Sequence, residues 1–323
     1  MSDTFWTKLK KPFFVLAPMA DVTDSAFRAI ITKYGKPDVL WTEFVSADGL
    51  LSPGREVLTK DLIFDKSERP IVAQIFSSHP DKILKATEIV RELGFDGIDI
   101  NMGCPDKSVE KQGAGAALIK NPKLAREIIK AAKEGAKDIP VSVKTRIGYN
   151  KNEIETWISN ILEEKVSTLT VHMRTRKDLS LVEAKWELME DVLKLRDSIS
   201  NGTLIIGNGD VKDLNDAKDK VSKYKVDGVM IGRGIFGNPW LFSDKNPSHI
   251  EKLKVLIEHT KKFEELCSHK SFSVMKKHYR AYVEGFPGAK GLRIKLMETS
   301  NSIEVEELIN DFLKRGENLD TLL

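Results

Sequence analysis

Short apolar runs rich in β-branched residues recur along the first three-quarters of the chain, and most are followed by an amphipathic stretch with helical spacing. Runs of four to six apolar residues that alternate with helices are typical of parallel strands buried on both faces. We predict eight strands, which cover Phe13–Ala17, Val39–Glu43, Ile71–Ile75, Gly97–Asn101, Val141–Lys144, Leu169–His172, Leu204–Gly207 and Gly228–Ile231.

The stretches between these runs predict helices. The Asn121-Pro122 pair is a favourable helix start, because Asn caps the first turn and Pro is tolerated at the first helical position. Eight strand–helix units in about 240 residues predict an α/β fold, a (β/α)8 TIM barrel. A doubly wound open sheet is the alternative, but no Gly-x-Gly-x-x-Gly follows the first strand. Clear helical stretches are Asp81–Leu93, Asn121–Gly135, Asn152–Glu164 and Val211–Tyr224.

The alternation stops after Phe236–Trp240, and from about His249 the apolar spacing is helical throughout. A polar segment, Ser243–Ser248, separates the two patterns. We therefore predict a barrel domain over residues 1–242 and a C-terminal all-α domain over residues 249–323.

Composition narrows the class of protein. The chain has 323 residues, 41% hydrophobic and 31% charged, which is typical of a globular protein with a charged surface. Its two cysteines, Cys104 and Cys267, form neither a disulfide framework nor a thiolate metal motif, so we expect no metal and a reducing, cytoplasmic location. The start of the chain lacks the pattern of a signal peptide, and no apolar stretch approaches the ~20 residues of a membrane helix. A monomer is expected.

The net charge of +3 is unevenly distributed. Eleven Lys and Arg oppose five Glu over residues 250–295, whereas two oppose seven Asp and Glu over residues 296–323. A basic block of this kind is compatible with a polyanionic partner, although a solvated helical face produces the same pattern.

Polar residues lie at or just after the ends of seven predicted strands, and Pro18 and Met19 follow the first. Barrel enzymes place their chemistry at this end of the strands. Glycine-rich segments after strands seven and eight suit a phosphate, because they let backbone amides approach it. The residues concerned are Pro18, Met19, Glu43, Gln74, Asn101, Cys104, Lys144, Arg146, His172, Arg174, Asn208, Gly209, Asp210, Gly232 and Arg233.

Cys104 lies between Gly103 and Pro105, directly after the fourth predicted strand. We expect these neighbours to fix the backbone, Gly103 through its conformational freedom and Pro105 through its restricted φ. A thiol held in this way suits proton transfer, but cysteine is also a common buried residue. We interpret Cys267 as a core residue, and Trp41 and Trp240 as packing residues.

Together, Leu16–Ala20, Ile98–Pro105, Lys144–Arg146, His172–Arg176, Gly207–Asp210 and Gly228–Arg233 resemble the tRNA-dihydrouridine synthases. The resemblance implies an enzyme that binds FMN, uses NADPH or NADH, and reduces uridines of tRNA to dihydrouridine. It implies Cys104 as the proton donor to C5 of the uracil and Asn101, Arg146, Arg174 and Arg176 as substrate-binding residues. It implies that Pro18, Met19, Ala20, Gln74, Lys144, His172, Asn208, Gly209, Asp210, Gly232 and Arg233 bind the cofactor.

The same resemblance assigns tRNA binding to the basic helical block, with Tyr279, Tyr282 and Phe286 contributing. Three stretches depart from the family pattern: Asp21 stands where Gly is usual, Ser77–Pro80 replaces a more glycine-like turn, and the loop Asp178–Val182 lacks the usual Gln, Tyr and Gly. Two other functions remain as alternatives, a flavin barrel that acts on a small pyrimidine and a phosphate-binding barrel with no redox role.

Overall fold

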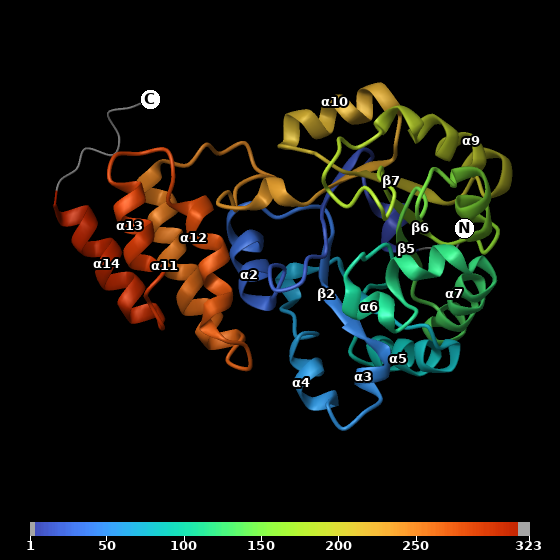
Figure 1. Ribbon diagram of the computed structural model, residues 1–323, viewed down its shortest axis with the longest axis horizontal. Coiled ribbons are helices and arrows are strands. Elements are labelled where there is room, and N and C mark those ends of the chain that lie inside the picture. Colours follow the sequence, from blue (N-terminus) through green and yellow to red (C-terminus); the bar gives the residue numbers. More distant parts are fainter. Residues whose placement is uncertain (1–3, 316–323) are drawn as a thin grey trace.

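Eight parallel strands form one closed sheet in the computed structural model, which describes residues 4–315. The (β/α)8 prediction is therefore confirmed (Figure 1). The open-sheet alternative is wrong, because β1 pairs with β8 and a parallel bridge from Val15 to Val39 joins β1 to the start of β2. The strands are β1 (Phe13–Leu16), β2 (Leu40–Ser46), β3 (Ile71–Phe76), β4 (Gly97–Met102), β5 (Val141–Arg146), β6 (Thr168–His172), β7 (Leu204–Asn208) and β8 (Gly228–Ile231).

Helices surround this sheet, and the predicted ones are largely present. Asn121 caps α7 by accepting a hydrogen bond from the Leu124 amide at 3.2 Å, and Pro122 follows it. The stretch predicted as one helix over Asn152–Glu164 is instead a π-helical turn, Ile154–Ile158, followed by the short α8. The barrel helices are α1 (Phe5–Lys8), α2 (Ser25–Tyr34), α3 (Ala47–Leu50), α4 (Arg55–Lys60), α5 (Pro80–Glu92), α6 (Lys107–Lys111), α7 (Pro122–Ala136), α8 (Ser159–Leu162), α9 (Met189–Ile199) and α10 (Leu214–Tyr224).

The amino-terminal end of the barrel is filled by apolar side chains. Trp6 from α1 lies beneath it, with its ring 6.0 Å from that of Trp41 and 5.7 Å from that of Phe13. All three are buried, so the interpretation of Trp41 as a packing residue is confirmed. A second apolar cluster lies between the sheet and the outer helices. Polar chemistry is consequently concentrated at the carboxyl end.

The C-terminal region is helical, and Figure 1 shows it beside the barrel with α2 between them. Ser248 starts α11 with a capping box that includes Glu251. The ends of the two predicted domains, residues 1–3 and 316–323, lie outside the described residues. Within residues 4–315, no helix is long and apolar enough to span a membrane. The helices are α11 (His249–Leu266), α12 (Lys276–Tyr282), α13 (Ala289–Leu296) and α14 (Ser302–Lys314).

The chain passes from β8 to α11 across the end of α2. Gly35 follows α2, and a Cβ there would lie 2.7 Å from the Pro239 oxygen and 2.8 Å from the Trp240 Cα. Trp240 is buried with its ring 4.9 Å from that of Tyr34, which confirms its packing role. Close backbone contact at Gly35 therefore sets how the helical region lies on α2.

We predict that Gly35→Ala destabilises the protein by about 1–3 kcal/mol, because the added methyl group meets backbone atoms that cannot move aside. The matched control is Gly291→Ala on α13, where a Cβ meets no atom within 4 Å. That substitution should be neutral or stabilise by about 0.5–1 kcal/mol. The midpoints of urea unfolding measure both, and equal midpoints for the two variants would contradict this view of the joint.

Candidate functional site

A pocket of about 790 Å³ opens at the carboxyl ends of β1, β5, β6, β7 and β8. Five cationic side chains and only two carboxylates line it, so the pocket carries a net positive charge. Most predicted cofactor-binding residues meet here. They are Pro18, Met19, Lys144, His172, Asn208, Gly209, Asp210, Gly232 and Arg233, joined by Arg174.

Two glycines keep the pocket open. At Gly232 a Cβ would be in ordinary contact with Ala17 and Met19, so the glycine leaves that part of the wall bare. Gly209 has φ +124°, and a Cβ there would lie 2.7 Å from the Ala184 Cβ. Only glycine suits Gly209 in both respects, since L side chains rarely adopt that conformation.

One end of the pocket suits an oxyanion. The backbone amides of Gly232 and Arg233 donate to no other group within residues 4–315, and the Arg233 side chain is 66% exposed. Arg233 Nη2 lies 2.9 Å from an oxygen of Asp210, which orients the guanidinium group. Free amides beside a guanidinium group are the usual setting for a bound phosphate.

Sequence reasoning missed two lysines at this pocket, Lys212 and Lys220. The Lys220 ammonium lies 4.9 Å from the centre of the Trp186 ring, which also lines the pocket. Lys212 lies two residues after the Asn208–Asp210 segment, and this closeness in sequence was a signal that could have pointed to it. Lys220 lies on α10, and its position in the sequence pattern of that helix does not show that its side chain reaches the pocket.

Lys144 is a half-buried cation of the pocket. Its Nζ lies 3.5 Å from Asn208 Oδ1, and the Asn208 amide is oriented by donating to the Met230 carbonyl at 2.8 Å. Burial and, to a smaller extent, the positive charge of Arg146 lower the pKa of Lys144 to about 8. A half-buried ammonium group with one long hydrogen bond is well placed to receive an acceptor from a ligand.

His172 is neutral at physiological pH. Burial holds its pKa well below the usual range, and the charges of Arg146 and Lys144 act in the same direction. Its Nε2 lies 3.1 Å from Arg174 Nη1, which can only donate, so the ring proton belongs on Nδ1. His172 can therefore donate one hydrogen bond to a bound group.

The turn that carries Cys104 is held by the side chain of Asn101. Asn101 Oδ1 accepts from the Gly103 amide at 3.1 Å and from the Cys104 amide at 2.9 Å. From the other side, the Cys104 carbonyl accepts from the Ala116 amide at 2.9 Å. Burial raises the pKa of the Cys104 thiol, an effect that the charges of Lys144 and Arg146 only partly oppose. The thiol is therefore fixed in position and protonated at neutral pH.

The expectation that Gly103 is needed for its conformational freedom is wrong. Its φ does not lie in the left-handed region, so conformational freedom is not required there. A Cβ at Gly103 would instead lie 3.1 Å from the Thr145 Cα on the neighbouring strand. The glycine is needed because the turn passes close to β5.

A chain of buried amide and carboxylate groups supports Asn101 from within the barrel. Asn101 Nδ2 donates to Gln74 Oε1 at 3.0 Å, and Gln74 Nε2 donates to Asp99 at 2.6 Å. Ser142 donates to the other Asp99 oxygen at 2.6 Å, while burial raises the pKa of Asp99 to about 6. The predicted cofactor ligand Gln74 and substrate ligand Asn101 thus bond each other in this structure, away from the pocket lining.

The three predicted substrate-binding arginines hold the loop over residues 175–182. Arg146 donates to the Gly103 carbonyl at 2.9 Å and to the Leu179 carbonyl at 3.0 Å, so it ties this loop to the cysteine turn. Arg174 donates to Val182 at 2.6 Å and pairs with Asp210, and Arg176 pairs with Glu110. Leu181, at the loop tip, is 82% exposed.

Cys104 and four further predicted residues are not part of the pocket lining. Ala20 is exposed beside it but is not part of its lining. The prediction that Tyr279, Tyr282 and Phe286 contact a polyanion is wrong, because all three are buried in the core of the helical region. Their helical spacing reflects packing, as does that of Cys267, whose core position is confirmed.

Solved structures with low sequence identity share the barrel fold. The chain superimposes on a 2-naphthoyl-CoA reductase with a TM-score of 0.54 at 11% identity, covering 71% of this chain and 49% of that one. It superimposes on histamine dehydrogenase from Rhizobium sp. 4-9 with a TM-score of 0.51 at 11% identity, covering 77% and 48%. The chain thus spans about half of each of these longer proteins.

Relatives in sequence match over nearly the whole chain. It is 40% identical over 321 residues to a probable tRNA-dihydrouridine synthase 2 of Bacillus subtilis (strain 168), covering 98% of both chains. It is 40% identical over 318 residues to a probable tRNA-dihydrouridine synthase of Staphylococcus aureus (strain COL), covering 97% of this chain and 96% of that one. The dihydrouridine synthase family itself matches over residues 15–317, and this chain belongs to that family.

Proposed function

We propose that the protein binds FMN at the barrel mouth and reduces specific uridines of tRNA to 5,6-dihydrouridine, with NADPH or NADH as the reductant. One observation carries the proposal: Lys144 lines a positively charged pocket, and its charge also acts on the thiol of Cys104, which is fixed in position and protonated at neutral pH. Family membership and the printed names of the relatives support the reaction and the tRNA substrate.

The residues present fit FMN. A flavin phosphate would be held by the free amides of Gly232 and Arg233, with the Arg233 guanidinium group and Lys212 supplying charge. The bare wall formed by Ala17, Met19 and Gly232 suits a flat ring. The site therefore offers groups that suit the phosphate of the cofactor and a surface that suits its ring.

Lys144 would face the pyrimidine edge of the ring, where negative charge accumulates on reduction. A half-buried ammonium group stabilises such charge more strongly than a solvated one. His172, held neutral, would donate from Nδ1 without adding a further positive charge. Pro18, Met19, Ala20, Gln74, Asn208, Gly209 and Asp210 complete the proposed cofactor site.

When bound and reduced, FMN would supply a hydride from N5 to C6 of the uracil. Cys104 would then donate its proton to C5, and its raised pKa keeps that proton in place at neutral pH. The target base must leave the RNA stack to enter such a site. Asn101 acts in this proposal by holding the Cys104 amide, and Arg146, Arg174 and Arg176 hold the loop that borders the base.

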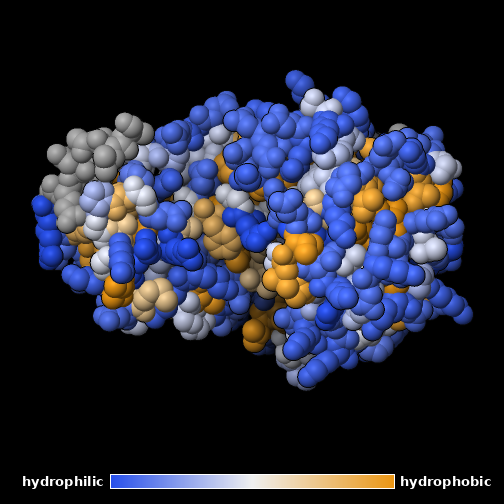
Figure 2. All heavy atoms as spheres, turned by 45° about the horizontal axis from the view of Figure 1, so that its top comes forward, coloured by the Kyte–Doolittle hydropathy of each residue, from blue (hydrophilic) through white to orange (hydrophobic). Residues whose placement is uncertain are grey.

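The tRNA would lie against the basic helical region and the barrel mouth. Hydrophilic side chains cover most of the face shown in Figure 2, over both the helical region and the barrel. Exposed cations of the block include Arg280, Lys290 and Lys295, and contacts from such groups to phosphates give binding that weakens with salt. The buried aromatic residues of α12 support this surface from beneath.

We predict that Cys104→Ala retains FMN and its reduction by NADPH but lowers the rate of dihydrouridine formation in unmodified tRNA by about 10²-fold or more, because the proton donor is lost. Rapid mixing of reduced enzyme with tRNA, followed by mass spectrometry of the RNA, measures this step. The control Cys267→Ser removes the other thiol but keeps a hydrogen-bonding group beside Ser25 Oγ, and it should leave the rate unchanged. Full activity of Cys104→Ala would exclude this cysteine as the donor.

We predict that the affinity for FMN falls as the pH rises through about 8, because Lys144 is protonated below that pH and neutral above it. Flavin fluorescence during titration of flavin-free protein from pH 6.5 to 9.5 measures the dissociation constant. Lys144→Met should bind FMN roughly ten-fold more weakly at pH 7 and lack the change near pH 8.

The matched control for that titration is Lys194→Met, which changes an exposed lysine on α9 outside the pocket. It should reproduce the wild-type curve. An affinity that is flat across this pH range in the wild type, or a change near pH 8 that persists in Lys144→Met, would show that Lys144 does not contact the flavin.

A further inference from the structure

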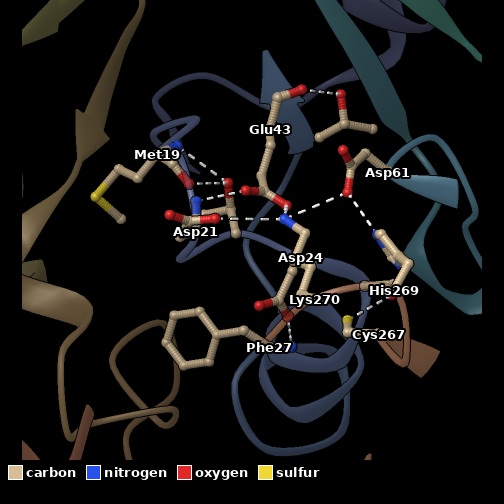
Figure 3. A network of polar contacts seen from close by, with 12 residues as sticks. Met19, Asp21, Asp24, Phe27, Glu43, Asp61, Cys267, His269 and Lys270 are labelled. Carbon is tan, nitrogen blue, oxygen red and sulfur yellow. Dashed lines mark hydrogen bonds and ion pairs between the residues drawn. The ribbon is translucent and has the colours of Figure 1, made fainter. Parts of the chain in front are cut away.

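A network of charged side chains joins the helical region to the barrel mouth (Figure 3). Lys270 lies in the turn after α11, and its Nζ lies 2.6 Å from Glu43 Oε2 and 3.3 Å from Asp61 Oδ1. The Lys270 side chain is 12% exposed and the Glu43 side chain 7%. Burial alone would lower the pKa of Lys270, but Glu43 and Asp61 raise it, so the lysine is charged. A cation of the helical region is thus inserted between carboxylates of the barrel.

Glu43 is aimed at Lys270 by an irregularity in β2. Trp41 pairs with Val72 and Phe44 with Gln74, so three steps along β2 oppose two along β3. An extra residue of this kind bends the strand and redirects a side chain. The bulge thus turns Glu43 toward the turn at the end of β1 as well as toward Lys270.

One carboxylate therefore connects two elements. While Glu43 Oε2 binds Lys270, Glu43 Oε1 accepts a hydrogen bond from the backbone amide of Asp21 (Figure 3). Asp21 lies two residues after Met19, whose side chain lines the pocket. Met19 and Thr23 also close this turn, since the Met19 amide donates to Thr23 Oγ1 at 3.0 Å and the Thr23 amide donates to the Met19 carbonyl at 3.0 Å.

The backbone conformation and contacts of Asp21 account for an aspartate at a position where the family usually has glycine. Its φ is +52°, in the left-handed region that glycine adopts freely and that Asp tolerates better than most residues. Its carboxylate lies 3.7 Å from Lys270 Nζ and 3.5 Å from Lys277 Nζ. The side chain that replaces the usual glycine thus adds a second contact between this turn and the helical region.

The turn that carries Lys270 is fastened at two further points. Cys267 Sγ lies 3.3 Å from Ser25 Oγ at the start of α2, and His269 Nε2 lies 3.0 Å from Asp61 Oδ1. These contacts hold the Lys270 turn of the helical region in place against the barrel. A movement of the helical region relative to the barrel would therefore move Lys270 and act directly on Glu43.

We propose that Lys270 is a positioning residue for the pocket: through Glu43 it holds the Met19–Asp21 turn, so the seating of the helical region sets the shape of the wall that Met19 forms. The consequence for the flavin rests on the function proposed above, whereas the effect on the turn does not. The same link would let RNA bound to the helical region and the ligand in the pocket influence each other.

Hydrogen exchange of the full-length protein, with and without FMN, tests the positioning directly. In Lys270→Met, the backbone amides of residues 17–24 should exchange about ten-fold faster or more, because Glu43 loses the group that fixes it. The FMN dissociation constant should rise by a similar factor. The control Lys261→Met removes a lysine that pairs with Glu306 within the helical region, and it should change neither quantity. The conservative Lys270→Arg should stay close to the wild type.

Equal exchange of residues 17–24 in Lys270→Met and Lys261→Met would overturn the proposal. If Lys270→Met does not fold, the double variant Glu43→Gln/Lys270→Met replaces it, because the side-chain amide introduced by Glu43→Gln can still accept from the Asp21 amide and carries no unpaired charge. That variant should exchange faster over residues 17–24 than Glu43→Gln alone, and equal rates would again overturn the proposal. A wild-type protein that fails to bind FMN would contradict the proposed function and leave the exchange comparison as the test of positioning.

Discussion

The barrel mouth holds more positive charge than its own carboxylates compensate, and the proposed chemistry depends on this excess. Arg146 and Arg174 are buried and Lys144 is half-buried, and each of the two arginines lowers the pKa of a cationic neighbour. In a medium of low effective dielectric such repulsion is strong unless an anion is present. A phosphate at one end of the pocket and a ring that becomes negative on reduction at the other would both relieve it.

The uncharged side chains at the barrel mouth fix the geometry of the site instead of its charge. The amides of Gln74 and Asn101 bond each other and the buried Asp99, and through Asn101 they fix the backbone that carries Cys104. A thiol placed in this way needs no rearrangement before it transfers a proton, which is the advantage of a site organised before the substrate binds. The cations thus provide the charge of the site, while the amides provide its geometry.

Much of this arrangement could be predicted from the sequence. Parallel strands in a closed sheet bring their carboxyl ends to one rim, so residues predicted to lie at or just after strand ends were correctly grouped, among them Lys144, His172 and Asn208. What side chains bond to is harder to predict. Gln74 and Asn101 bond each other, and whether such polar groups point inward or into the pocket depends on packing that strand periodicity does not describe.

Contacts between distant segments were out of reach for the same reason. Glu43 and Lys270 are 227 positions apart, and their pairing depends on a bulge in β2 and on the turn after α11. Gly103 was rightly singled out, but the strand beside it, not its own φ, explains the glycine. The aromatic residues of α12 show the opposite error, since helical spacing near lysines resembles a binding surface whether or not the rings are buried.

The central claim is that this barrel reduces uridines within tRNA, and mapping dihydrouridine in cellular tRNA tests it most directly. Dihydrouridine is two mass units heavier than uridine, so mass spectrometry of tRNA from cells with and without the gene locates each modified position. We expect at least one position to lose the modification in the deletion strain and to regain it with the wild-type gene but not with the Cys104→Ala variant. Unchanged dihydrouridine at every position in a strain with no other member of the family would contradict the account.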